Sequence, residues 1–159
     1  MKELGWWRLL GLCAIVALFL FVMFGLPLPA TGPQRPLLAG AEVPPPVQQV
    51  LARSCQDCHS YNTTWPWYAR IAPLRWYVTR DVEKARRALN LSEWEMYSAA
   101  EKHRLLTRMA DLSRLHQMPP PAYIFGHREV VEHHAGRIAL EEWAKQEAGR
   151  LAGGAGGAP

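Results

Sequence analysis

Residues 9 to 28 carry no charged side chain and read LLGLCAIVALFLFVMFGLPL. About 20 apolar residues are enough to cross the hydrocarbon core of a bilayer as a helix, so this stretch does not belong in the core of a small water-soluble domain. The flank before it, residues 1 to 8, holds two tryptophans and two basic side chains, as expected at a cytoplasmic interface. We therefore predict a membrane-spanning helix over 9–28, with residues 1–8 in the cytoplasm.

A cleaved secretory signal is the alternative interpretation of the same stretch, because residues 28 to 30, Leu-Pro-Ala, end in a small residue. The apolar run is longer than the 7 to 15 residues typical of a signal peptide core, which favours an uncleaved anchor. Either interpretation places the rest of the chain outside the cytoplasm. The predicted location is the inner (cytoplasmic) membrane, with a single crossing and the C-terminal domain on the periplasmic side.

Proline and glycine set the predicted limits of the domain. Residues 27 to 46 hold seven of the 13 prolines, and such a composition resists both helix and sheet. We predict a tether over 29–46 that lets the domain swing. The segment 151–159 is rich in Gly and Ala and is predicted to be a disordered tail. The folded domain is then predicted to occupy residues 47–150.

One motif inside this domain implies a cofactor. Cys55 and Cys58 are separated by two residues, and His59 follows directly. Two cysteines at this spacing can bond to the two vinyl groups of a porphyrin, and the next histidine can bind its iron from one side. The sequence therefore predicts one covalently attached haem c, held by Cys55, Cys58 and His59. In bacteria this attachment takes place outside the cytoplasm, which agrees with the location predicted from the apolar run.

Two other uses of paired cysteines were weighed. A zinc site needs a second pair of ligands, and the other cysteine, Cys13, lies inside the apolar run. A redox dithiol of the thioredoxin type needs alternating strands and helices around the motif, and the sequence does not show this pattern.

Helical periodicity predicts an all-α domain. Val47, Val50 and Leu51 share one helix face and predict a short helix leading into Cys55. Ser92 and Glu95 match a capping box and predict a helix over 92–112. Two further helices are expected, over 75–89 and near the C-terminal end. The side chains expected to face the core are Val82, Ala85, Leu89, Trp94, Leu105, Leu106, Met109, Val131, Ile138, Leu140, Trp143 and Ala144.

The second axial ligand of the iron is predicted to be Met118. It follows the predicted helix 92–112 and precedes three prolines, which stiffen the backbone after it. Methionine pairs with histidine in cytochromes c. A core-filling role is the alternative for Met118, and His116 is the main rival as a ligand. The remaining histidines, His103, His127, His133 and His134, are expected to be surface or hydrogen-bonded residues.

Several motifs, taken in order over about 100 residues, resemble the haem-binding domain family of monohaem cytochromes. They are Cys55 to Ser60, Trp65 to Tyr68, Ile71 to Pro73, Trp76, Asp81-Val82, Leu89 to Trp94, Met118 to Pro120, Tyr123, His127 and Trp143. The resemblance implies Met118 as the distal ligand, and it leaves residues 1–43 out. Arg75 and Ala85 depart from it, since a small hydroxyl residue and a glycine are expected there.

The predicted function is a membrane-anchored monohaem c-type cytochrome that carries single electrons and is not an enzyme. The alternatives are a haem-based gas or redox sensor, and an accessory subunit of a respiratory complex. Redox proteins are the expected partners. The formal net charge of +4 includes a run of arginines that could steer an acidic partner or bind a haem propionate. They are Arg70, Arg75, Arg80, Arg86 and Arg87. Nucleic acid is excluded by the location.

Overall fold

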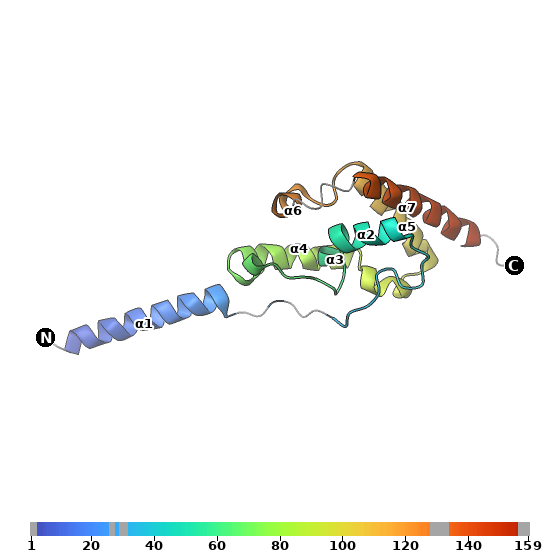
Figure 1. Ribbon diagram of the computed structural model, residues 1–159. Coiled ribbons are helices and arrows are strands. Elements are labelled where there is room, and N and C mark those ends of the chain that lie inside the picture. Colours follow the sequence, from blue (N-terminus) through green and yellow to red (C-terminus); the bar gives the residue numbers. More distant parts are fainter. Residues whose placement is uncertain (1–2, 26–27, 29–31, 128–133, 156–159) are drawn as a thin grey trace.

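The computed structural model describes the chain except for residues 1–2, 26–27, 29–31, 128–133 and 156–159. The described residues form helices and contain no strand, which confirms the all-helical fold class (Figure 1). Besides α-helices there are one π-helical turn, η1, and two 3-10 helices, η2 and η3. The elements are α1 (Glu3–Phe24), α2 (Pro45–Val50), η1 (Leu51–Cys55), α3 (Gln56–His59), η2 (Trp67–Arg70), α4 (Leu74–Ala88), η3 (Leu91–Met96), α5 (Ala99–Arg114), α6 (Pro121–Gly126) and α7 (His134–Ala155).

Helix α1 is the apolar helix predicted from the sequence, and it projects from one end of the molecule (Figure 1). Its apolar span runs from Gly5 to Phe24, with a mean hydropathy of 2.4 and none of it buried inside the protein. The helix is therefore long and apolar enough to be a membrane span or a signal sequence. It ends before the predicted boundary at residue 28, because Gly25 and Pro27 both oppose continuation of a helix.

The proline-rich segment packs against the domain from residue 32 onward. Leu38 is fully buried in the core, and its N–H donates to the Leu91 carbonyl at 2.9 Å. The Asn62 side chain accepts from the Arg35 N–H at 3.4 Å and donates to the Arg35 carbonyl at 3.0 Å. The indole N–H of Trp143 donates to the Glu42 carbonyl at 3.0 Å. This part of the chain is more closely held than a freely swinging tether.

The capping box lies six residues after its predicted position. Ser98 and Glu101 form it: the Ser98 hydroxyl accepts from the Glu101 N–H, and the Glu101 carboxylate accepts from the Ser98 N–H. The predicted start of this helix at Ser92 is wrong. Asn90 accepts from the Ser92 N–H at 3.1 Å and begins the short 3-10 helix η3 instead, because an Asn side chain competes well for backbone donors.

The last helix, α7, continues to Ala155 and so extends five residues into the segment predicted to be a disordered tail. Of the side chains predicted to face the core there, Leu140, Trp143 and Ala144 are buried. Ile138 is exposed. Val131 lies outside the described residues.

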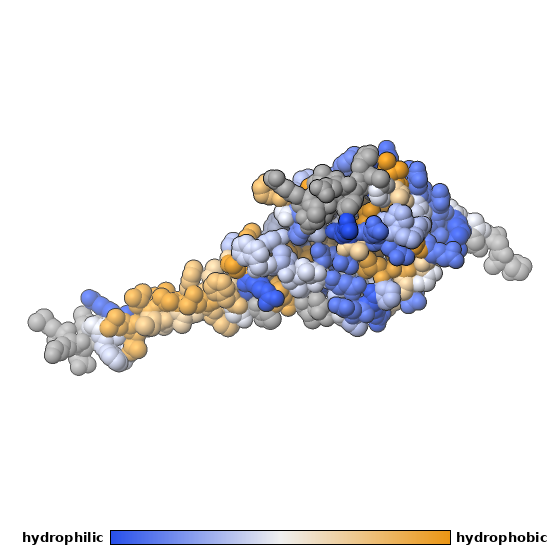
Figure 2. Space-filling model, viewed as in Figure 1, coloured by the Kyte–Doolittle hydropathy of each residue, from blue (hydrophilic) through white to orange (hydrophobic). Residues whose placement is uncertain are grey.

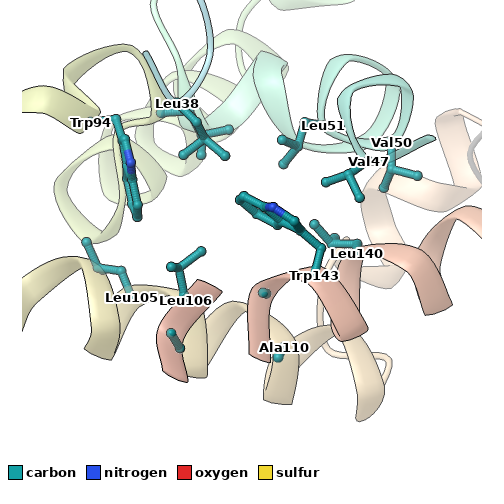
Figure 3. Close-up of a cluster of buried hydrophobic side chains, with 13 residues drawn as sticks. Leu38, Val47, Val50, Leu51, Trp94, Leu105, Leu106, Ala110, Leu140 and Trp143 are labelled. Carbon is teal, nitrogen blue, oxygen red and sulfur yellow. The ribbon is translucent and has the colours of Figure 1, made fainter. Parts of the chain in front are cut away.

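The core is formed where α5 and α7 pack side by side and α2 with η1 covers them. Figure 3 shows the Trp143 ring between Leu51 and the helical layer below it, with Trp94 and Leu105 at one end. Burying large apolar side chains of this kind contributes roughly 1.5–3 kcal/mol each. The core thus fixes η1 and, through it, the position of the cysteine motif that follows.

Candidate functional site

The cysteine motif lies where a π-helical turn gives way to a short α-helix. Cys55 ends η1, and Cys58 and His59 lie in α3. Val47, Val50 and Leu51, which predicted a helix leading into Cys55, are buried in the core. Both cysteines are partly buried free thiols. The short helix brings the two thiols and the imidazole to one end of the domain, packed against α4.

The imidazole of His59 is held by the end of α4. Its Nδ1 lies 3.0 Å from the carbonyl oxygen of Leu89, the residue that caps α4 at its C-terminal end. A carbonyl can only accept, so Nδ1 carries the proton and Nε2 is left as a lone-pair donor. Burial lowers the pKa of His59, and the Leu89 and Ala85 carbonyls offset part of this effect. The geometry therefore favours a neutral ring whose Nε2 can bind a metal.

Asp57, between the two cysteines, organises the loop that follows the motif. Its Oδ1 accepts from the Thr64 N–H at 2.9 Å, and its backbone carbonyl accepts from the Thr63 hydroxyl at 2.7 Å. Ser60, fully buried, donates from its hydroxyl to the Gln56 carbonyl at 2.7 Å. The loop is thus folded back onto α3, which restricts the motion of the motif.

Arg86 fixes the same loop from α4. Its Nε donates to the Ser60 carbonyl at 2.9 Å and its Nη2 to the Thr63 hydroxyl at 2.8 Å. The guanidinium also lies 5.2 Å from the centroid of the Tyr61 ring, a cation–π contact. One of the five arginines considered for a partner or a propionate is therefore engaged within the protein.

Met118 follows directly on the cap of α5. The helix ends in a Schellman motif: the His116 N–H donates to Ser113 at 3.0 Å and the Gln117 N–H to Leu112 at 2.9 Å. His116 takes the left-handed position of this motif, with φ 55°. Its side chain and that of Met118 are exposed. The backbone role of His116 explains its place two residues before Met118.

Helix α6, just after the prolines that follow Met118, contacts the cysteine motif. The Tyr123 hydroxyl donates to Asp57 Oδ2 at 3.2 Å. The Tyr123 ring stacks on His127, with centroids 4.2 Å apart, and His127 Nε2 lies 3.3 Å from the Tyr68 hydroxyl. These contacts join residues 118–127 to the side of the domain that carries Cys58 and His59.

The remaining four histidines were expected to be surface or hydrogen-bonded residues, and the structure describes the side chains of two of them. His103 is a structural residue, since its Nδ1 lies 2.8 Å from the Ala148 carbonyl and ties α5 to α7. His127 belongs to the contact between α6 and η2. His133 lies outside the described residues, and nothing is described of the side chain of His134.

Burial raises the pKa of both motif thiols, to about 12 for Cys55 and about 11 for Cys58. The neighbouring Asp57 and Asp81 carboxylates add to the effect at Cys58. Redox dithiols have lowered thiol pKa values, so these surroundings do not favour dithiol exchange. Across the described ranges no group of three or more His, Cys, Asp and Glu side chains is arranged for a metal ion.

The residues present fit a haem. Two free thiols at the vinyl-binding spacing adjoin an imidazole with a free Nε2. In addition, the indole Nε1 of Trp65 is buried with no hydrogen-bond partner among the described residues. A buried donor without an acceptor is unfavourable, and a haem carboxylate is an acceptor of suitable charge.

Sequence reasoning missed the roles of three residues of this site. Asp57 occupies a variable position of the motif, Leu89 acts through its backbone, and Arg86 is one basic residue among many. The position of Leu89 at a helix end is the one feature that sequence reasoning could have used, because such carbonyls need partners.

One comparison with known proteins gives a match. The family model described as haem-binding domain matches residues 14–146. The match begins inside α1, so it includes residues 14–43, which the resemblance noted from the motifs left out. A search of curated proteins and a search of solved structures each found no match. Because the model covers most of the chain, this protein belongs to the haem-binding domain family.

Proposed function

We propose that the protein is a membrane-anchored monohaem c-type cytochrome that carries single electrons in the periplasm. The observation that carries the proposal is the Cys55-x-x-Cys58-His59 motif with the His59 Nδ1 bound to a backbone carbonyl. That bond sets the tautomer and the orientation that an axial iron ligand needs. Cys55 and Cys58 would hold the porphyrin covalently, one thioether each.

Met118 is the proposed second ligand. The rigid cap of α5 precedes it, and the bond from Tyr123 to Asp57 draws the segment after it toward the motif. A flexible thioether with several rotatable bonds can reach an iron from an exposed position. His116 is a weaker choice because its backbone is committed to the left-handed position of the cap.

When bound, the haem supplies a one-electron redox centre with a raised potential under His/Met ligation. The chain's own residues keep that centre in place. His59 stays neutral and oriented by Leu89, while Asp57 and Arg86 hold the loop that covers α3. His59 and Met118 would bind the iron and leave small molecules no site on it, which suits a carrier rather than an enzyme.

The location rests on α1. An apolar span of 20 residues exceeds the length of a signal peptide core, and the family match begins within it. We infer that the helix is retained as an anchor in the cytoplasmic membrane, with the domain on the periplasmic side, where haem c is attached.

The ligand assignment is tested with the full chain produced together with a haem c maturation system. Met118→Ala and His116→Gly are compared with the parent protein by absorption spectra of the reduced form, with and without carbon monoxide. Glycine suits the left-handed position, so His116→Gly keeps the cap and removes only the imidazole.

The proposal predicts that the parent and His116→Gly proteins ignore carbon monoxide and that Met118→Ala binds it. Loss of six-coordination in His116→Gly, with Met118→Ala unchanged, would assign the ligand to His116. Stoichiometric binding of carbon monoxide by the parent protein would contradict the electron carrier and indicate a gas sensor.

A further inference from the structure

The haem domain is attached to the C-terminal end of α1 by hydrogen bonds. The Arg75 Nη2 donates to the Val22 carbonyl at 2.9 Å, and the Ala72 N–H donates to the Met23 carbonyl at 3.3 Å. The last four carbonyls of a helix lack partners within the helix, and a cation at that end is favourable. Arg75 is almost fully buried in this contact, with 2% of its surface exposed. The start of α4 is therefore fixed to the end of the apolar helix.

Four large side chains lie exposed around this attachment. They belong to η2 and to the first turn of α4, within eleven residues of the sequence. Their exposed fractions are 74% for Trp67, 51% for Leu74, 49% for Trp76 and 59% for Tyr77. We name these four residues the aromatic collar. Figure 1 shows α4 beginning beside the end of α1, and Figure 2 shows the apolar surface of α1 continuing up to the domain.

The side chains of the aromatic collar are typical of a membrane surface. Trp and Tyr gather at the interface between membrane and water, because their rings are apolar while their N–H and O–H groups need polar partners. Arg70, between Trp67 and Leu74 in the sequence, and Arg80, three residues after Tyr77, are exposed and carry the charge that anionic headgroups attract. A helix that crosses the bilayer ends at that same depth, and the collar is held there by Arg75 and Ala72.

We propose that the aromatic collar lies in the headgroup layer of the membrane that α1 spans, so that the haem domain docks on the lipid surface. The proposal rests on the proposed function, in which α1 is a retained anchor. A docked domain has a fixed face toward the bilayer. Met96 of η3, which follows the other end of α4, is exposed and remains in water.

The test uses the full holoprotein in vesicles of phosphatidylethanolamine and phosphatidylglycerol that contain a phospholipid with a photoreactive acyl chain. After illumination, mass spectrometry measures the label on α1, on residues 67–77 and on Met96. Met96 is the matched control, because its exposed fraction of 73% is close to the 74% of Trp67. The collar is expected to carry at least about fivefold more label than Met96.

Two variants separate docking from misfolding. Trp67→Gln with Leu74→Gln changes exposed positions, and Arg75→Met removes the bond to α1. Both should lower the collar label at least about threefold while the haem spectrum is retained. Strong label on α1 with a collar labelled no more than Met96 would overturn the docking alone. A mature protein that lacks α1 would overturn the anchor of the proposed function, and docking with it.

Discussion

The hydrogen bond from Tyr123 to Asp57 should control how tightly Met118 closes over the iron. Bonds to a charged acceptor contribute about 1.5–3 kcal/mol. This one joins oxygens 3.2 Å apart at a partly buried site, longer than the usual range for O–H···O bonds. We therefore assign it about 1 kcal/mol. Tyr123→Phe keeps the ring that stacks on His127 and removes the hydroxyl.

A loss of about 1 kcal/mol shifts the equilibrium between closed and open forms of residues 118–127 about fivefold toward the open form. Under the proposed ligation by His59 and Met118, an external ligand such as imidazole binds only when Met118 is displaced, so its apparent affinity should rise by the same factor. The assay is a titration of the oxidised holoprotein with imidazole, followed by absorption. Tyr77→Phe is the control, since it deletes a hydroxyl from an exposed ring of α4 and leaves the bond between Tyr123 and Asp57 in place.

Met118→Ala provides the upper limit, because it removes the competing ligand. If imidazole affinity in Tyr123→Phe stayed within twofold of the parent protein while Met118→Ala bound far more tightly, helix α6 would have no part in holding the distal ligand. A rise of equal size in Tyr77→Phe would show a general loosening of the fold, and the reasoning about α6 would also fail.

Three further predictions concern stability, measured by urea unfolding of the holoprotein. Hydrogen bonds from the Ser98 side chain and backbone hold the pKa of Glu101 below its ordinary 4.5, so the folded state binds fewer protons there. The stability that the Glu101 carboxylate contributes is complete above pH 4.5 and is lost as the pH falls through the lower pKa of the folded state. Glu101→Gln should therefore destabilise the protein at pH 7 and match the parent in acid; a constant difference at every pH would refute this. Trp65→Phe should cost about 1.5–3 kcal/mol, because it removes the indole donor from which a haem carboxylate would accept; a variant as stable as the parent, or more stable, would show that the indole has no partner. Leu106→Ala, at a fully buried position of α5, should cost about 2–5 kcal/mol, and a loss below 1 kcal/mol would place the core elsewhere.

Periodicity identified the elements that long, regular patterns define. The helix over 75–89 appears as α4, and Leu105 and Leu106 are buried in α5 as expected. The predicted start of α5 is wrong because two serines, Ser92 and Ser98, each precede a glutamate by three residues, and either pair could form the capping box. The choice depends on Asn90, which binds the Ser92 N–H and leaves the box to Ser98. Local patterns do not rank such competitors.

The sequence predicts the part of the candidate site that lies within one short motif. The spacing of Cys55, Cys58 and His59 predicts that they hold a haem, and the structure places them on η1 and α3; their binding of haem stays a prediction. The supporting contacts could not be predicted, because they join distant parts of the chain: His59 to Leu89, 30 residues away, and Tyr123 to Asp57, 66 residues away. Proline content likewise predicted an open tether. It could not show that Leu38 would be fully buried against η3.

The proposed function depends on a covalent haem on Cys55 and Cys58. The most direct test is the intact mass of the denatured full chain after production with a haem c maturation system. We predict the mass of the polypeptide plus one haem, and the loss of the added mass when both cysteines are replaced by serine. A denatured chain with the mass of the polypeptide alone, from cells that mature other c-type cytochromes, would contradict it.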